Sequence, residues 1–77
     1  MDRALELEAQ SKFAEALDEL EVVVARSPTN LDAIRHAYGA ACKSKNEPKA
    51  KLYFARLPDK DKTILQFVCI KNHVNVP

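Results

Sequence analysis

The chain has 77 residues, of which 47% are hydrophobic, enough for one small folded domain and too many for a disordered segment. One glycine, no tryptophan and eleven alanines favour helices and argue against a β-sandwich or barrel, which needs turn glycines and β-branched strands. Twelve basic and eleven acidic residues give a net charge of +1, which excludes a strongly basic nucleic-acid binder.

Prolines and helical periodicity divide the chain into five predicted helices. Pro28 and Pro58 each end a helix, because proline removes a backbone donor and forces the preceding residue out of the helical region. We expect Asn30, Asn46 and Asp59 to cap the last three helices. The expected helices cover about residues 4–9, 12–26, 31–45, 47–57 and 59–73. In the fifth, we expect the buried stripe to contain Ile64, Phe67 and Val68.

The cysteine count and the N-terminus bear on the compartment. A disulfide-stapled secreted scaffold of this size carries four or more cysteines, whereas this chain has only Cys42 and Cys69. We therefore expect reduced, buried thiols and a cytoplasmic protein. The acidic, amphipathic N-terminus is not typical of a signal peptide, and the apolar runs are too short for membrane insertion.

Two segments of the chain share a pattern at a spacing of 34 residues. The first has an aromatic residue, a small residue, two large apolar residues and a proline. The second has a small residue and two large apolar residues at the matching places. This pattern resembles the second helix of a tetratricopeptide repeat, and the resemblance covers about residues 1–57. The repeat positions are Phe13, Ala16, Leu20, Val23 and Pro28 in the first segment, and Ala50, Phe54 and Leu57 in the second.

The resemblance implies an all-α fold of antiparallel helical hairpins stacked as a fragment of a right-handed α-solenoid. One domain, 1–77, would contain a first repeat over 1–30 that is truncated at its start and a second repeat over 31–57. The segment 59–73 would be a C-terminal capping helix, because the ends of a solenoid need cover for their apolar faces.

Histidine and cysteine residues provide one candidate metal set, His36, Cys42, Cys69 and His73. Its spacing is poor, because His36 and Cys42 lie on different faces of one helix and no paired-cysteine knuckle is present. A Cys69–His73 nucleophilic pair would also need an orienting group, an oxyanion hole and a pocket. We therefore expect no metal, no cofactor and no catalysis, with a small Cys/His metal-binding protein as a distant alternative.

Charge is distributed unevenly between the two parts of the chain. Residues 1–30 contain seven acids and three bases, whereas residues 31–77 contain four acids and nine bases. A solvated surface explains such a pattern in the simplest way. A sharper interpretation is a surface for an acidic partner segment, or head-to-tail contact between copies.

The resemblance also implies a function and a surface for it. We expect a non-catalytic protein–protein interaction module, an adaptor, scaffold or escort chaperone, that binds a helix or extended peptide. Its inner surface would contain Leu5, Glu8, Asp32, Arg35, Cys42 and Lys43. The residues by which some members of the family clamp a terminal carboxylate are absent, since Gly39 stands where an asparagine is required.

The alternative is a structural end fragment of a longer repeat array, or a module that forms homodimers. In solenoids an uncovered end exposes a core-like surface. The self-association candidates on this ground are Ala4, Leu5, Leu7 and Phe13.

Overall fold

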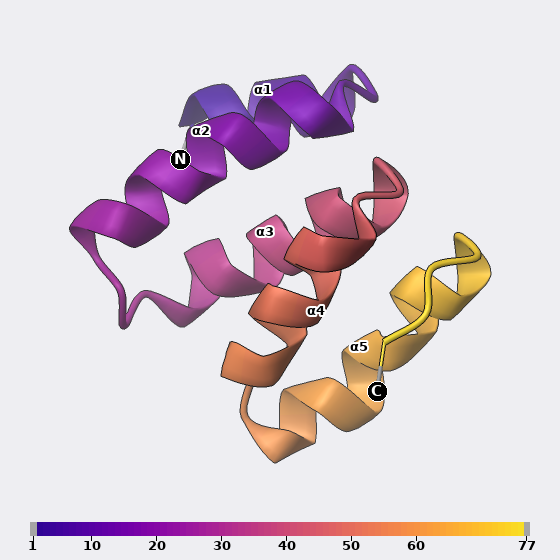
Figure 1. Cartoon of the computed structure of the whole chain (residues 1–77). Coiled ribbons are helices and arrows are strands. Elements are labelled where there is room, and N and C mark those ends of the chain that lie inside the picture. Colours follow the sequence, from indigo (N-terminus) through magenta and orange to yellow (C-terminus); the bar gives the residue numbers. More distant parts are fainter. Residues whose placement is uncertain (1, 77) are drawn as a thin grey trace.

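A computed structural model describes residues 2–76, and within them the protein has five α-helices and no strand (Figure 1). The helices are α1 (Asp2–Ala9), α2 (Phe13–Arg26), α3 (Leu31–Lys43), α4 (Glu47–Arg56) and α5 (Asp59–Lys71). The all-α prediction is therefore confirmed. None of these helices has the length and apolar character needed to cross a membrane.

Side-chain caps begin two of the helices as the sequence predicts. Asn30 Oδ1 accepts a hydrogen bond from the Ala33 amide at 3.2 Å, and Asn46 Oδ1 accepts one from the Lys49 amide at 3.3 Å. The prediction for α5 was wrong, because Pro58 occupies the N-cap position and no side chain caps this helix. Asp59 is instead the first helical residue, where its charge faces the positive end of the helix.

The central element of the packing is α3, which contacts α2, α4 and α5. Its buried surface consists largely of small side chains, which let neighbouring helices approach closely. Tyr38 is also fully buried, and its hydroxyl donates a hydrogen bond to the carbonyl oxygen of Leu65 in α5 at 2.9 Å. The fully buried alanines of α3 are Ala33, Ala37, Ala40 and Ala41.

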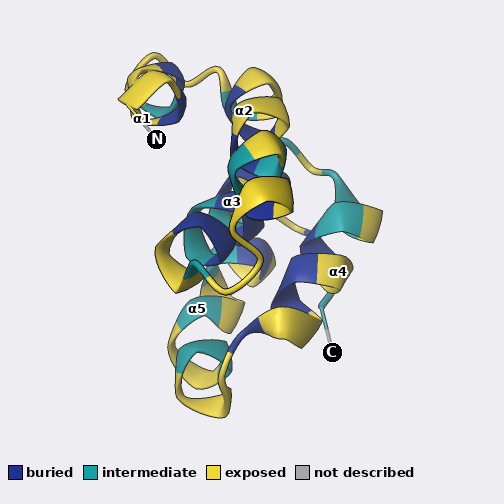
Figure 2. Ribbon diagram, turned by 90° about the vertical axis from the view of Figure 1, so that its left-hand side faces the viewer, coloured by how far each residue is buried: buried dark blue, intermediate teal, exposed yellow. Residues whose placement is uncertain are grey.

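The fifth helix presents a different face to the core from the one expected. Ile64 and Phe67 are 53% and 56% exposed, so the predicted buried stripe is wrong at both positions. Figure 2 shows most of α5 as exposed or half-buried, and Cys69 is its only fully buried residue. The rotation of α5 is fixed by the Tyr38 hydrogen bond and by Arg35, whose Nε lies 2.9 Å from Asp61 Oδ2. Neither contact can be read from helical periodicity.

Cys42 and Cys69 form a disulfide that joins the C-terminal ends of α3 and α5. The expectation of reduced thiols was therefore wrong. The two Cα atoms lie 4.6 Å apart, within the range that a disulfide spans, because these two helix ends pack side by side. Both cysteines are fully buried, so the bond is shielded from solvent.

The backbone repeats at the ends of the odd-numbered helices. Ser11, Lys45 and His73 follow α1, α3 and α5, and all three have a positive φ close to 60°. Ser11 and Lys45 are 34 residues apart, as are the first residues of α2 and α4. The same hydrogen bond closes each end at 2.8 Å, from Lys12 N to Leu7 O, from Asn46 N to Ala41 O and from Val74 N to Cys69 O.

Most of the proposed repeat positions lie in the core. Phe13 and Val23 are half-buried, and Pro28 is exposed in the turn between α2 and α3. Ala16 and Ala50 are completely buried, which is consistent with a close approach of two helices at each of these positions. The buried positions are Ala16, Leu20, Ala50, Phe54 and Leu57.

A polar contact joins α2 to α4 beside this core. Glu21 Oε2 accepts hydrogen bonds from Lys49 Nζ and from the Tyr53 hydroxyl, both at 2.8 Å. Burial raises the pKa of Glu21, but the hydrogen bonds from Lys49 and Tyr53 and the charge of Lys49 outweigh it, so the net shift is downward. Burial, together with Glu21, raises the pKa of Tyr53 to about 12.

We predict that removal of the disulfide, in Cys42→Ala/Cys69→Ala, lowers the free energy of unfolding by about 3–4 kcal/mol, because the bond closes a 27-residue loop in the unfolded chain. The loss of stability should be greatest in α5, because Cys69 is the only fully buried residue of this helix. Urea unfolding and backbone NMR shifts measure the two effects. A thiol reductant should mimic the substitution in the wild type and change nothing in the variant. An unchanged urea midpoint with α5 fully helical would contradict the prediction.

We predict that Glu21→Gln lowers the free energy of unfolding by about 1 kcal/mol at pH 7. Since the pKa of Glu21 is lower in the folded protein, this stabilisation is present above its ordinary value of 4.5 and is lost as the pH falls through the folded value. Unfolding measured from pH 7 to about pH 3 should therefore bring wild type and variant together. Glu6→Gln, at an exposed position on α1, is the control. A difference that stays constant with pH would show that the carboxylate charge is not responsible.

Candidate functional site

Three hollows surround the C-terminal end of α3, and Lys43 lines all of them. The Gly39 hollow, of about 310 Å³, is lined by Glu8, Arg35, His36, Gly39, Lys43, Leu65 and Val68. The Phe13–Phe67 hollow, of about 430 Å³, is lined by Phe13, Lys43, Phe67, Val68, Lys71 and Asn72. The Ser11–Ser44 hollow, of about 320 Å³, is lined by Ser11, Lys12, Phe13, Ala14, Glu15, Lys43 and Ser44.

The Gly39 hollow lies between α1, α3 and α5, the three helices that end in the same backbone conformation. Polar side-chain contacts join the helices at its edges. His36 Nδ1 of α3 lies 3.1 Å from Glu8 Oε2 of α1, and Arg35 of α3 pairs with Asp61 of α5. The hydrogen bond to Asp61 raises the pKa of Arg35, whose guanidinium is charged at neutral pH in any environment.

The floor of this hollow is an open stretch of helix backbone at Gly39. A Cβ atom added at Gly39 would meet no other atom within 4 Å. The residue is in the middle of α3 and its φ is not positive, so neither a turn nor close packing of another element requires a glycine there. The missing side chain therefore widens the hollow without serving the fold.

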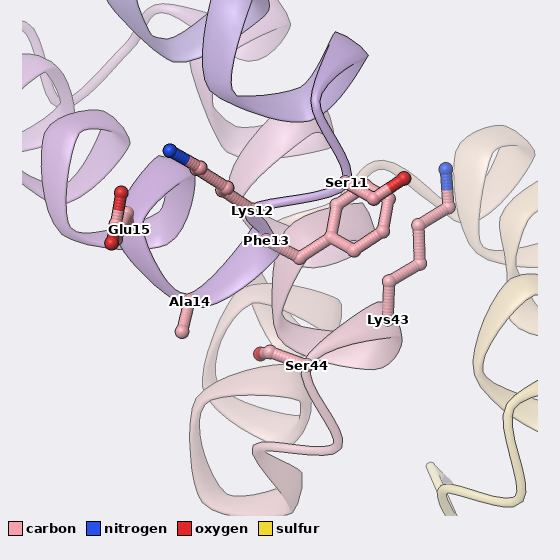
Figure 3. A pocket seen from close by; sticks show the side chains of 7 residues that line it. All are labelled: Ser11, Lys12, Phe13, Ala14, Glu15, Lys43 and Ser44. Atoms are coloured by element: carbon pink, nitrogen blue, oxygen red, sulfur yellow. The ribbon is translucent and has the colours of Figure 1, made fainter.

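The Ser11–Ser44 hollow has a more polar lining than the other two hollows. It lies across Phe13 from the Phe13–Phe67 hollow. Figure 3 shows the Phe13 ring next to the Lys43 side chain, with Glu15 on the far side of the hollow. Lys43 Nζ lies 5.1 Å from the centre of the Phe13 ring, in cation–π contact. Lys43 and Phe13 thus form the wall that this hollow shares with the Phe13–Phe67 hollow.

Half of the predicted partner-binding residues meet in the Gly39 hollow. Glu8, Arg35 and Lys43 line it. Asp32 is adjacent, since its Oδ1 lies 3.0 Å from Arg35 Nη1. Leu5 is 43% exposed but lines none of the three hollows. Cys42 is fully buried in the disulfide and offers no surface to a partner.

The self-association candidates separate into two groups. Ala4 and Leu7 are 1% and 2% exposed, so they belong to the core and cannot contact a second molecule. This corrects the expectation that α1 leaves an uncovered apolar face. Leu5 is exposed, and Phe13 is half-buried at the hollows described above.

The candidate metal and nucleophile residues are constrained by the disulfide. Because both sulfurs are bonded to each other, neither Cys42 nor Cys69 can act as a thiolate ligand beside His36 and His73, and Cys69 cannot act as a nucleophile with His73. Within residues 2–76, no group of three or more His, Cys, Asp or Glu side chains is placed to hold a metal ion.

Sequence reasoning missed four features of these hollows. Gly39 was noted only as a departure from the carboxylate clamp, although a lone glycine inside a helical pattern is a signal for an unusual position. Phe67 was assigned to the buried stripe of the fifth helix, and no binding role was predicted for Lys71. The Glu8–His36 contact joins residues of separate helices and has no local signature.

Comparison of the chain with protein-family models, with curated proteins and with solved structures finds no significant match. The geometry of the hollows and the repeat pattern are therefore the features of the chain that bear on its function.

Proposed function

We propose that the chain is a non-catalytic protein–protein interaction module of tetratricopeptide-like build. It binds a helix or an extended segment of a partner protein in the Gly39 hollow. Adaptors, scaffolds and escort chaperones are the kinds of interaction protein to which such a module would belong. The observation that carries it is the glycine at the floor of the hollow.

Glycine is an unfavourable residue in the interior of a helix, where it is about 1 kcal/mol worse than alanine. Gly39 is the only glycine of the chain and lies near the middle of the central helix. An alanine would fit, since nothing lies within 4 Å of its Cβ position. The gain that offsets this loss of stability is access: a partner backbone or large side chain can approach α3 closely between Arg35 and Lys43.

The repeat geometry supports the same surface. In the tetratricopeptide-like arrangement that we propose, α1, α3 and α5 are the first helices of successive pairs, and first helices form the inner surface. The shared backbone ends of these helices agree with that assignment. So does the hollow that they line together. In this arrangement α5 would also serve as the capping helix.

The compartment stays a prediction. The low cysteine count favours the cytoplasm, but the Cys42–Cys69 disulfide argues against it, because disulfides persist mainly in oxidising compartments.

We predict opposite effects on stability and binding at Gly39. Gly39→Ala should raise the free energy of unfolding by about 1 kcal/mol, because the new methyl group favours the helix and meets no neighbour. Gly39→Phe should also fold, but its ring should fill the hollow and abolish partner binding. Leu52→Phe, on the exposed side of α4, is the matched control.

Urea unfolding measures the stability, and quantitative affinity purification from the source cells measures the partners retained by each variant. Loss of the same partners from Gly39→Phe, with retention by Leu52→Phe, is the expected result. Equal recovery with all variants, or no partner specific to the wild type, would contradict the proposed function.

A further inference from the structure

The Phe13–Phe67 hollow has a basic and aromatic lining. Lys43 and Lys71 are the charged residues among the six that line it, and no acid is among them. Phe67 is 56% exposed at its rim, and Ile64 and Ile70 continue the apolar surface along α5 with exposures of 53% and 61%. Contiguous exposed apolar surface with aromatic residues is typical of an interaction site.

The two lysines have no acidic partner within residues 2–76, because no carboxylate lies within 4.0 Å of either ammonium group. Each is the last residue of its helix, where a positive charge is favourable. That preference explains a lysine at each position. It does not explain why the two lysines meet at one hollow beside an exposed aromatic ring. A ligand that carries a carboxylate next to an apolar side chain would pair with the lysines and cover the ring.

A surface of that chemistry exists on the same chain, on the outer face of α2. Asp18, Glu19 and Val22 are exposed and lie on one side of the helix at i, i+1 and i+4. Val22 is 50% exposed, an apolar side chain flanked by two acids. Within the described residues neither acid is part of an ion pair. We call these three residues the acidic ridge.

We propose that the acidic ridge of one copy docks in the Phe13–Phe67 hollow of a second copy. Val22 would enter the hollow beside Phe13 and Phe67, while Asp18 and Glu19 would pair with Lys43 and Lys71. The contact joins two different surfaces, so it leaves a free ridge and a free hollow on each pair and extends to longer assemblies. It goes beyond the proposed function, since it uses a different hollow and a different partner.

Light scattering across concentration and salt tests the proposal on the intact chain. The weight-average molar mass should rise past that of a dimer between about 10 μM and 1 mM. It should fall back towards the monomer when salt is raised from about 50 to 500 mM, because exposed ion pairs are screened. One contact of this size is weak, so the mass should increase gradually.

Charge reversal separates this contact from any other. Lys43→Glu/Lys71→Glu reverses the hollow, and Asp18→Lys/Glu19→Lys reverses the ridge, so each variant alone should be monomeric at low salt. An equimolar mixture should regain mass, since each reversed surface now meets its complement on the other variant. Lys45→Glu/Lys60→Glu changes the charge equally at exposed positions outside the hollow and should leave more association than reversal of the hollow. Circular dichroism confirms that each variant is helical.

Three results would overturn the proposal. A wild type that stays monomeric at 1 mM and low salt would exclude the contact. Association that persists in both reversed variants, or is insensitive to salt, would assign it to another surface, such as a symmetric pairing of α5 faces. Reversed variants that are monomeric alone and remain so when mixed would show that ridge and hollow do not meet. None of these three results would contradict the proposed binding at the Gly39 hollow, which Gly39→Phe tests separately.

Discussion

Close packing around α3 is the constraint on which the rest of the structure depends. Four alanines of this helix are completely buried, and they let α2, α4 and α5 approach its backbone from three directions. Tyr38 fills the remaining space and ties α3 to α5 through its hydroxyl. In a domain of 77 residues the core is thin, so one helix that supports three others contributes a large share of the stability.

The same helix also carries the candidate site. Arg35, His36, Gly39 and Lys43 lie on the side of α3 that faces the Gly39 hollow, whereas the alanines face the core. Binding residues on a rigid, well-packed element are held in place at little entropic cost. The disulfide reinforces this arrangement, because Cys42 precedes Lys43 and Cys69 follows Val68, so it fixes the two walls that the Gly39 and Phe13–Phe67 hollows share.

Local signals in the sequence predicted the helices well. Pro28, Pro58, Asn30 and Asn46 mark helix ends through backbone and capping chemistry, which acts within a few residues. The 34-residue spacing predicted the burial of Ala16 and Ala50, and it reappears in the backbone at Ser11 and Lys45. Glu8, Arg35 and Lys43 were placed on one surface by the family resemblance, and they line one hollow.

What the sequence could not predict depends on how distant segments meet. The disulfide requires the ends of α3 and α5 to lie side by side, and a spacing of 27 residues contains no information about that. Periodicity gave α5 an apolar stripe but not its rotation, which depends on contacts of α5 with Tyr38 and Arg35 of α3. Ala4 and Leu7 were expected at an open end, yet they are buried, because the position of α1 on its neighbours is not encoded in its own eight residues.

Amide hydrogen exchange followed by NMR tests the central position of α3 most directly. If α3 supports the other helices, its amides from Ile34 to Cys42 open only when the whole domain unfolds, and they should exchange with the lowest rates in the chain. Amides of α1 and of the first turns of α5 should exchange orders of magnitude faster through local opening. Slowest exchange in α1 or α5, with rapid exchange along α3, would contradict the proposed role of α3.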